Sequence, residues 1–430
     1  MQIHLKAIGC RLNEAELEGW AREFKADGHQ VVNDANEADL MVFNSCAVTQ
    51  QAVRKSRQYI KRIQRDNPSA KIVMSGCYAS LSPEEAAGAL GVDLVVENKQ
   101  KDQLVKIATQ ELNLPVMPQA ATEPGESSLF QRGRQRAFIK IQDGCRYRCT
   151  FCIVTVARGD ERSRTLEEIV AEINDFHQQG IQEIALTGVH VGGYGSDIDS
   201  TLYQLLETIL RETDMPRIRL ASVEPWDLPE HFFELFKSPR LMPHMHLPLQ
   251  SGTNSVLRRM ARRCKTADFK ALVEQARAAV PNFNITSDII VGFPGETEQE
   301  WQESLAFIQQ IGFGHLHIFS YSPRSGTKAA TLANPIPEKV KKERSKILHQ
   351  LAQEMKLKTL AGYVGHQVEV LWEGEGKTQA DGKKRYWGYA PNYLRVAVDV
   401  DPEQKMSNQI TAVTLKSVDL EGECLLAQPD

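Results

Sequence analysis

Three cysteines stand close together in the middle of the chain. Cys145, Cys149 and Cys152 form a C-x3-C-x2-C run just after a predicted strand, in a loop that Asp143 and Gly144 open. Three thiolates at this spacing can hold three irons of a 4Fe-4S cluster and leave the fourth iron without a protein ligand. The spacing therefore predicts an iron–sulfur site with one open iron.

A structural zinc ion is the alternative occupant of these thiolates. Zinc in a structural site takes four protein ligands in a closed tetrahedron, and the cysteine run supplies three. His177 and His190 are the residues that we consider for the fourth position.

A second set of three cysteines is scattered through the first hundred residues. Cys10, Cys46 and Cys77 each come just beyond the carboxyl end of a predicted apolar strand. Neighbouring strands of a parallel sheet lie about 4.8 Å apart, and their carboxyl ends meet at the edge where such sheets form ligand crevices. Each cysteine taken alone fits a buried structural thiol. Their shared position favours a second three-thiolate cluster.

The elements that position these cysteines follow from the hydrophobic pattern. Residues 1–114 alternate strands at 3–8, 40–43, 72–74 and 94–96 with helices at 14–25 and 52–64, which predicts an α/β domain with a parallel sheet. A Pro-, Ala-, Glu- and Ser-rich segment then predicts a linker over residues 115–130.

The segment from 131 to 361 repeats the strand–helix alternation. Strands are predicted at 137–141, 183–186, 218–221, 244–247, 285–291 and 315–321, and helices at 166–178, 202–211, 300–310 and 338–360. Six such units favour a partial (β/α)6 barrel with its chemistry at the carboxyl ends of the strands. Residues 362–430 contain β-forming segments at 367–371, 394–398, 409–415 and 423–426, which predict a small antiparallel β-barrel.

Composition limits the class of protein. The formal net charge of −4 neither indicates nor excludes a nucleic-acid partner. No apolar run reaches the roughly 18 residues of a membrane span, and no secretory leader is recognisable. We therefore expect a cytoplasmic protein without a membrane partner. Basic runs, each fitting either a solvated face or a phosphate contact, are Arg54, Lys55, Arg57, Lys61, Arg62 and Arg65; Arg258, Arg259, Arg262, Arg263 and Lys265; and Arg132, Arg134, Arg136, Lys140, Arg146 and Arg148.

The two cysteine sets and their surroundings resemble the methylthiotransferases of the radical S-adenosylmethionine (SAM) superfamily, which insert sulfur into an unactivated C–H bond and methylate it. The resemblance covers nearly the whole chain, with a TRAM-like RNA-binding barrel as its last domain. The motifs that carry it, besides the six cysteines, are Gly9 to Glu16, Cys152-Ile153-Val154, Arg158-Gly159, Leu186-Thr187-Gly188-Val189, His246 to Gly252, Asp288 to Thr297, Tyr321-Ser322-Pro323-Arg324 and Gly326-Thr327.

This resemblance implies two 4Fe-4S clusters and SAM as cofactors, with the six cysteines as the catalytic and metal-binding residues. One SAM molecule methylates sulfur held at the N-terminal cluster. The other, cleaved at the second cluster, gives the 5′-deoxyadenosyl radical that abstracts hydrogen from the substrate. The two clusters must therefore face each other, and an unidentified electron donor and sulfur source are implied.

The subgroup is indicated by Arg11-Leu12-Asn13 after the first cysteine and by Ser222-Val223-Glu224-Pro225. It is similar to the enzymes that methylthiolate carbon 2 of N6-threonylcarbamoyladenosine in the tRNA anticodon stem-loop. Isopentenyladenosine and a ribosomal-protein aspartate are the alternative substrates, and a non-catalytic iron–sulfur or RNA-binding protein is the rival class. Departures from the family pattern at Thr155, Cys264 and Ser325 leave the fine specificity open.

Further site residues are predicted at strand ends and in the last domain. For SAM and its cavity we consider Gly188, Val189, Gln250, Ser251 and Gly292, although an ordinary turn also explains the glycine at 292. For RNA, cations beside stacking rings predict contacts by Lys383, Lys384, Arg385, Tyr389 and Arg395, with aromatic packing as the alternative. The pairs His244/His246 and His315/His317 are interpreted as hydrogen-bonded barrel histidines rather than metal ligands.

Overall fold

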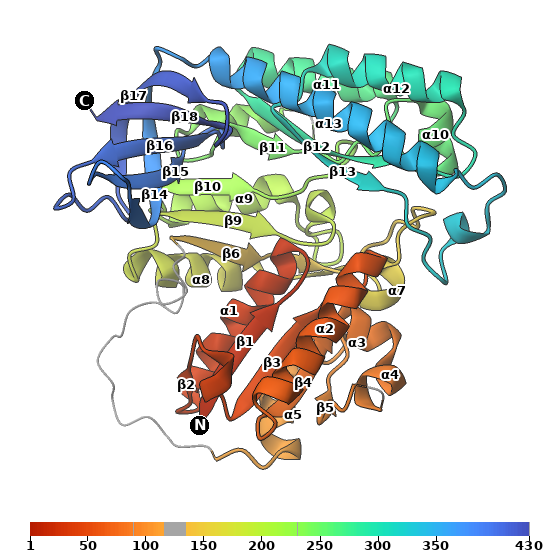
Figure 1. Ribbon diagram of the computed structural model, residues 1–430, viewed down its shortest axis with the longest axis vertical. Coiled ribbons are helices and arrows are strands. Elements are labelled where there is room, and N and C mark those ends of the chain that lie inside the picture. The colour runs from red at the N-terminus through yellow and green to blue at the C-terminus, as the bar shows by residue number, and fades with distance from the viewer. Residues whose placement is uncertain (89, 116–134, 230, 430) are drawn as a thin grey trace.

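The N-terminal domain is a parallel sheet in the computed structural model, which describes residues 1–88, 90–115, 135–229 and 231–429. Its strands are β1 (Gln2–Ala7), β2 (Gln30–Val31), β3 (Leu40–Ser45), β4 (Lys71–Gly76) and β5 (Leu94–Val95). They are ordered β2-β1-β3-β4-β5 (Figure 1). The predicted sheet is confirmed, and the short edge strand β2 is an addition to it.

Helices cover both faces of this sheet. On one face, α1 (Arg11–Ala26) and α5 (Leu104–Glu111) bury Trp20, Phe24 and Leu104 against the strands. On the other face lie α2 (Gln50–Asp66), α3 (Cys77–Leu81) and α4 (Pro83–Ala87). The strands carry apolar residues on both faces, as expected for a sheet that is buried on both sides.

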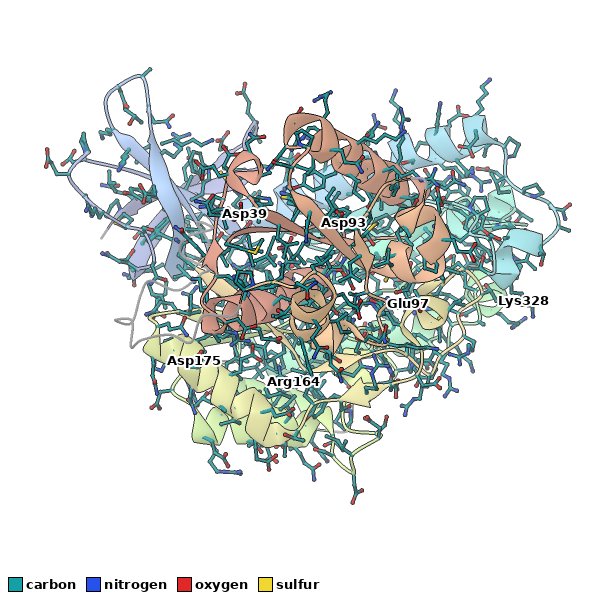
Figure 2. All side chains as sticks on the ribbon, turned by 90° about the horizontal axis from the view of Figure 1, so that it is seen from below. Asp39, Asp93, Glu97, Arg164, Asp175 and Lys328 are labelled. Carbon is teal, nitrogen blue, oxygen red and sulfur yellow. The ribbon has the colours of Figure 1, made fainter. Side chains whose placement is uncertain are left out.

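The amino edge of the sheet is closed by carboxylates. Asp39 accepts a hydrogen bond from the backbone N–H of Gln2 at 2.8 Å, and Asp93 accepts one from Ile72 at 2.7 Å. Figure 2 labels both aspartates on the N-terminal domain. Because the strands are parallel, the cysteine loops lie at the opposite edge.

The central domain contains all six predicted strands. They are β6 (Arg136–Lys140), β9 (Glu183–Thr187), β10 (Arg217–Leu220), β11 (His244–His246), β12 (Asn284–Val291) and β13 (His315–Ser320). They form two three-stranded parallel sheets, β10-β9-β6 and β11-β12-β13, which single parallel bridges at Ile218–Leu241 and Ser222–His246 join. The result is the open six-stranded barrel that the sequence predicts.

Outer helices complete the barrel. The long ones are α8 (Leu166–Gln178), α9 (Leu202–Glu212), α11 (Thr266–Ala279), α12 (Glu298–Ile311) and α13 (Glu338–Ala361). Short elements at the carboxyl end are β7 (Gln142–Asp143), α7 (Val154–Arg158), β8 (Arg162–Ser163) and α10 (Asn254–Arg259). Capping boxes, Thr165 with Glu168 and Thr297 with Glu300, fix the starts of α8 and α12.

The C-terminal domain is a closed five-stranded barrel. Its strands are β14 (Gln367–Thr378), β15 (Lys384–Tyr389), β16 (Arg395–Val400), β17 (Ile410–Asp419) and β18 (Cys424–Pro429), ordered β14-β15-β16-β18-β17. The predicted barrel is confirmed with two differences: β15 was not among the predicted segments, and β16 and β18 pair in parallel. Strand directions cannot alternate all the way around a closed barrel of five strands, so one neighbouring pair must be parallel.

The C-terminal barrel is attached to the amino ends of the central strands. Arg217, at the start of β10, donates hydrogen bonds to the backbone oxygens of Glu369 and Tyr389, each at 3.0 Å. Asn284, at the start of β12, donates one to the backbone oxygen of Asn392 at 2.9 Å. This barrel therefore lies at the end of the central domain opposite the cysteine loop (Figure 1).

Two predictions concern residues that lie wholly or partly outside the described ranges. The predicted linker lies outside the described residues except for residue 115, as do Arg132 and Arg134 of the third basic run. In the part of the chain that the structure describes, no helix is both long and apolar enough to cross a membrane.

Candidate active site between two cysteine triads

The N-terminal triad comes together at one edge of the sheet. Cys46 directly follows β3, Cys77 directly follows β4, and Cys10 precedes α1 just beyond β1. These three strands are neighbours. A Cβ atom at Gly9, whose φ is +125°, would lie 3.0 Å from the Cys46 Sγ, so the loop that carries Cys10 passes directly against Cys46. Burial raises the pKa of Cys46 to about 11, and repulsion from Cys10 and Cys77 adds to it.

The second triad lies in the loop between β7 and α7. Cys145 donates its backbone N–H to Gly159 at 3.1 Å, and Cys152 donates its own to Cys149 at 3.0 Å. Burial raises the pKa of Cys145 to about 12 and that of Cys152 to about 11. Thiols of this kind keep their protons until a metal replaces them, which fits metal ligands better than free nucleophiles.

The tight fold of this loop depends on Gly144. Its φ is +73°, and an added Cβ would lie 1.9 Å from the backbone oxygen of Asp160. A side chain there would push apart the two strands of the small β7–β8 sheet and displace Cys145.

His190 is not free to act as a fourth ligand for this triad. Its Nδ1 bonds to Glu161 and its Nε2 to Asp227 at 2.6 Å. Burial alone would lower the pKa of His190, but the hydrogen bond to Asp227 and the charge of Glu224 raise it above its usual value. Both ring nitrogens are therefore engaged by carboxylates, which leaves neither of them to ligate zinc beside the triad.

His177 is also unsuited to that position. It lies in the last turn of α8, which runs against the strand direction, and so at the amino side of the barrel. The other cysteines among the described residues belong to other surroundings: Cys264 packs in the central core and Cys424 begins β18. The donor set is thus three thiols at each site, which fits two clusters that each have an open iron.

A cavity of about 190 Å³ lies between the two cysteine loops. Val48 and Thr49, which follow Cys46, form one wall, and Cys152 with its neighbours forms another. Gln250, Asp288 and Tyr321 complete the cavity from the barrel side. Its mouth is apolar and open, since Val48 is 48% and Phe319 44% exposed. The cavity thus borders Cys152 of the second triad directly, and the first triad through the residues that follow Cys46.

Arg158 ties the two triads together. It ends α7, the helix that begins two residues after Cys152. Its Nε donates to the Cys77 Sγ at 3.4 Å, and its Nη2 donates to the Asn13 side chain at 2.8 Å. The same Asn13 oxygen accepts from the Cys10 Sγ at 3.5 Å. One side chain therefore spans from the second cysteine loop to two cysteines of the first.

Arg158 is also part of a buried group of four charges. Its Nη1 donates to Glu16 at 2.8 Å and to Asp143 at 2.9 Å, and Lys101 pairs with both carboxylates. The four side chains are at most 5% exposed. Burial alone would raise the pKa of Glu16, but Arg158 and Lys101 outweigh it and lower that pKa to about 2. Arg158 and Glu16 both occur in the sequence motifs, but no role was predicted for them, because the local sequence does not show that their side chains are in contact.

The residues predicted for SAM lie at the carboxyl ends of the central strands. Gly188 and Val189 follow β9, and the Gln142 side chain accepts from the Val189 N–H at 3.1 Å. Gln250 lines the cavity in a left-handed conformation, with φ +75°. Such strain in a residue other than glycine is typical of functional positions. Ser251 is buried beside it.

Gly292 has a packing explanation. Its φ is +74°, and an added Cβ would lie 2.3 Å from the Lys341 side chain of α13. Its N–H donates to Glu296 at 3.0 Å. The glycine therefore permits α13 to pack against the end of β12.

The four barrel histidines face one another across the central strands. His246 Nε2 lies 3.1 Å from Asp288, and His244 Nε2 lies 3.2 Å from the Thr286 hydroxyl. The rings of His246 and His317 are 5.4 Å apart. Hydrogen bonds were predicted for all four rings, and the structure gives them for His244 and His246. Sequence spacing could not identify Asp288 because it lies on the neighbouring strand.

The residues predicted for RNA lie on β15 and β16, except Lys383, which directly precedes β15. Lys383 is exposed, and Arg385 forms a bidentate pair with Asp399 at 2.7 and 2.6 Å. Arg395 lies over the Trp387 ring at 5.8 Å.

Lys384 and Tyr389 make internal contacts. The ammonium of Lys384 lies 5.8 Å from the Tyr386 ring centre. The Tyr389 ring stacks on Tyr393 at 4.7 Å beneath the guanidinium of Arg136. Trp387 is thus the ring on this face that cations flank.

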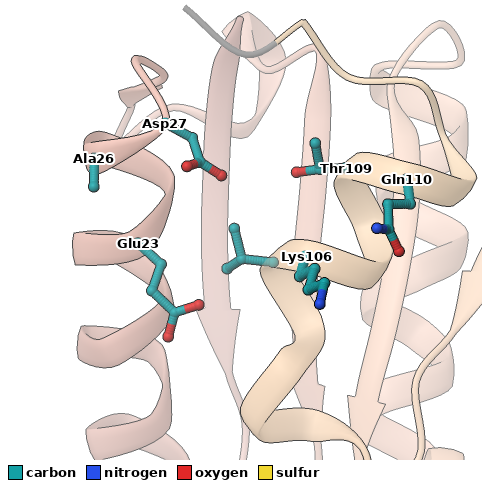
Figure 3. Close-up of a pocket in the computed structure, with 7 residues that line it drawn as sticks. Glu23, Ala26, Asp27, Lys106, Thr109 and Gln110 are labelled. Atoms are coloured by element: carbon teal, nitrogen blue, oxygen red, sulfur yellow. The ribbon is translucent and has the colours of Figure 1, made fainter. Parts of the chain in front are cut away.

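A second hollow, of about 360 Å³, lies between α1 and α5 on the surface of the N-terminal domain. Figure 3 shows Glu23 and Asp27 of α1 facing Lys106, Thr109 and Gln110 of α5. It lies at the carboxyl end of α1, about 20 Å along the helix from the cysteine edge. It is therefore separate from the cavity between the triads.

Comparisons with known proteins agree with this arrangement. Residues 139–308 match the radical SAM superfamily and residues 2–97 match the uncharacterized protein family UPF0004. The chain is 38% identical to the threonylcarbamoyladenosine tRNA methylthiotransferase MtaB of Thermotoga maritima, over 86% of each chain. It is 36% identical to MtaB of Bacillus subtilis, over 92% of this chain and 89% of that one. It is 34% identical to tRNA-2-methylthio-N(6)-dimethylallyladenosine synthase of Bacillus velezensis, over 88% and 77%.

Solved structures share the fold at low identity. The radical SAM methyltransferase TsrM from Kitasatospora setae, with cobalamin and a [4Fe-4S] cluster bound, is 17% identical with a TM-score of 0.58, over 76% of this chain and 77% of that one. With two matched domains and relatives that span its length, the chain belongs to the radical SAM methylthiotransferases, tRNA-modifying enzymes that use SAM and two 4Fe-4S clusters.

Proposed function

We propose that this chain transfers a methylthio group to carbon 2 of N6-threonylcarbamoyladenosine in the anticodon stem-loop of tRNA. The observation that carries the proposal is the cavity whose walls come from the residues after Cys46 on one side and from Cys152 on the other. A base in that cavity lies within reach of both triads at once. Because the substrate is tRNA, we place the reaction in the cytoplasm.

The two triads have separate roles in this proposal. Cys145, Cys149 and Cys152 hold the cluster that cleaves SAM, and Cys10, Cys46 and Cys77 hold the cluster that carries the sulfur. When bound, these groups supply the electron for radical formation and the sulfur that is methylated. Gly188, Val189, Gln250 and Ser251 are the candidates to position SAM, because they lie where the central strands end at the cavity. An external electron donor and a sulfur source complete the reaction.

The threonylcarbamoyl group is favoured over an isopentenyl group by the charge at the first cysteine. Arg11 follows Cys10, is exposed, and makes no ion pair with any residue that the structure describes. Its guanidinium lies 5.0 Å from the Phe138 ring centre on β6. A guanidinium that forms no ion pair with the described residues suits the carboxylate of the threonyl group, and an isopentenyl group offers it no partner.

Mass spectrometry of tRNA nucleosides tests the substrate. Bulk tRNA from a strain that lacks the protein should lose 2-methylthio-N6-threonylcarbamoyladenosine and retain the unmethylthiolated nucleoside. Reconstituted enzyme should restore it, and Arg11→Gln should reduce the yield. Loss of the isopentenyl product, or a modified ribosomal-protein peptide in place of a modified nucleoside, would reject the proposal in favour of an alternative substrate.

Contact with RNA outside the cavity is proposed for the C-terminal barrel. Lys383, Lys384, Arg385 and Arg395 supply the positive charge on β15 and β16, and Trp387 supplies a ring between the cations Lys377 and Arg395. Tyr389 contributes by holding this face against the central domain, because the guanidinium of Arg136 on β6 lies 5.1 Å from its ring centre. Rings flanked by cations suit unpaired nucleotides.

A further inference from the structure

Helix α2 carries an exposed basic face. Within the helix the only acidic residue is its last, Asp66. Arg54, Lys61 and Arg65 are spaced by seven and four residues, so they lie along one line of the helix, and Lys55 and Arg62 form a second line beside it. The exposed cations of α2 are Arg54, Lys55, Arg57, Lys61, Arg62 and Arg65.

Most of this charge is not used inside the protein. Arg57 pairs with Glu85, and Arg65 with the adjacent Asp66. Arg54, Lys55 and Lys61 make no hydrogen bond or ion pair with any residue in the described ranges.

The basic run at residues 258–265 contains arginines that are in contact with other side chains. Arg259 donates to Glu300 at 2.9 and 2.7 Å. Arg262 lies 4.2 Å from the Trp226 ring centre, and Arg263 lies 4.5 Å from that of Tyr147. Arg259, Arg262 and Arg263 are occupied by intramolecular contacts, as Arg62 of α2 is by the Tyr59 ring at 5.5 Å, whereas Arg54, Lys55 and Lys61 of α2 face solvent.

The position of α2 connects this face to the reaction cavity. Thr49 caps the helix by accepting from the Ala52 N–H at 3.1 Å, and Val48 and Thr49 both line the cavity. From Arg54 to Arg65 the helix rises about 16 Å. The line of cations therefore runs outward from the mouth of the cavity, along the sheet face that α1 does not cover (Figure 1).

We propose that α2 binds tRNA phosphates and guides the anticodon stem-loop so that its modified base enters the cavity. The inference rests on the proposed function, because it takes that cavity as the place of the base. An acidic electron-donor protein is the rival partner for the same charge. RNA is favoured because a base in the cavity must carry its flanking phosphates out past Val48 and Thr49, where α2 begins.

A variant of α2 that lacks three positive charges tests this assignment. Arg54→Gln, Lys55→Gln and Lys61→Gln combined remove three unpaired cations without touching a buried side chain. The matched control is Lys106→Gln, Arg211→Gln and Lys237→Gln, three exposed cations that are not part of the cavity lining. Both variants change the net charge equally.

The measurement is binding of an anticodon stem-loop RNA across a salt titration, with the holoenzyme. Each lost phosphate contact lowers the slope of log K against log salt by about 0.7, so the α2 variant should lose about 2 and the control should match the wild type. An α2 variant with the wild-type slope overturns the inference. An α2 variant that binds RNA normally, but whose iron–sulfur clusters a protein electron donor reduces more slowly, also overturns the inference.

The outcomes separate this inference from the proposed function. A wild-type protein that binds no stem-loop RNA would reject the function itself. A wild-type protein that binds RNA with a steep salt dependence, together with an unaffected α2 variant, would reject only the role of α2.

Discussion

Replacing Arg158 by methionine should destabilise the junction between the two cysteine triads more than any surface change. Arg158 and Lys101 balance Glu16 and Asp143 in a group that is almost fully buried. Removing one cation leaves a negative charge without compensation in the interior. Breaking a buried pair in this way costs about 3–5 kcal/mol, a large part of the roughly 5–15 kcal/mol that stabilises a domain.

The assay is urea unfolding of the purified chain, with iron content measured on the same samples. Arg158→Met should lower the unfolding free energy by about 3 kcal/mol or more. It should also reduce the iron retained at the N-terminal triad, because the donor to the Cys77 sulfur is lost. Arg162→Met is the control. Arg162 also contacts Asp143, at 3.5 Å, but it is 44% exposed and should cost less than about 1 kcal/mol. Equal stability of the two variants would refute the reasoning.

Two further predictions concern a buried glutamate of the central domain and the basic face of the C-terminal barrel. Burial alone would raise the pKa of Glu183, but Arg136 and Arg219 outweigh it and hold that pKa at about 2. The ion pairs therefore stabilise the fold above pH about 4.5, and about 3 kcal/mol of unfolding free energy should be lost as the pH falls toward 2. Unfolding curves at pH 5 and pH 3 measure this loss, and Glu183→Gln should make it smaller. Replacing Lys383, Lys384 and Arg385 with alanine should weaken tRNA binding and reduce its salt dependence, and unchanged binding across the titration would reject a role for that face.

Local pattern predicted most of the fold. Each strand of the N-terminal sheet except β2, and each of the six central strands, was predicted within a few residues of its observed bounds. Buried parallel strands are continuous apolar runs, so they are visible without knowledge of their partners. Strand β2 has only two residues and little apolar character, and it depends on its pairing with β1. The parallel pairing of β16 with β18 likewise depends on the path of the chain.

The candidate site likewise has residues that the sequence predicts and residues that depend on how the domains pack. The cysteines were predicted because strand order places Cys10, Cys46 and Cys77 at one edge, and the spacing of Cys145, Cys149 and Cys152 is local. The contacts of Arg158 could not be predicted. It lies 142 residues from Glu16 and 81 from Cys77, so their meeting depends on how two domains pack. The inward contact of Tyr389 has the same cause, because Arg136 reaches it from a distant segment.

Iron content combined with SAM cleavage tests the central claim most directly. Protein purified without oxygen should hold about eight irons per chain, as two four-iron clusters require. Cys46→Ala should hold about four irons and still release 5′-deoxyadenosine on reduction, but should make no methylthio product. Cys149→Ala should release none. A wild-type chain with only four irons, or a Cys46→Ala variant that fails to cleave SAM, would contradict two cooperating clusters around one cavity.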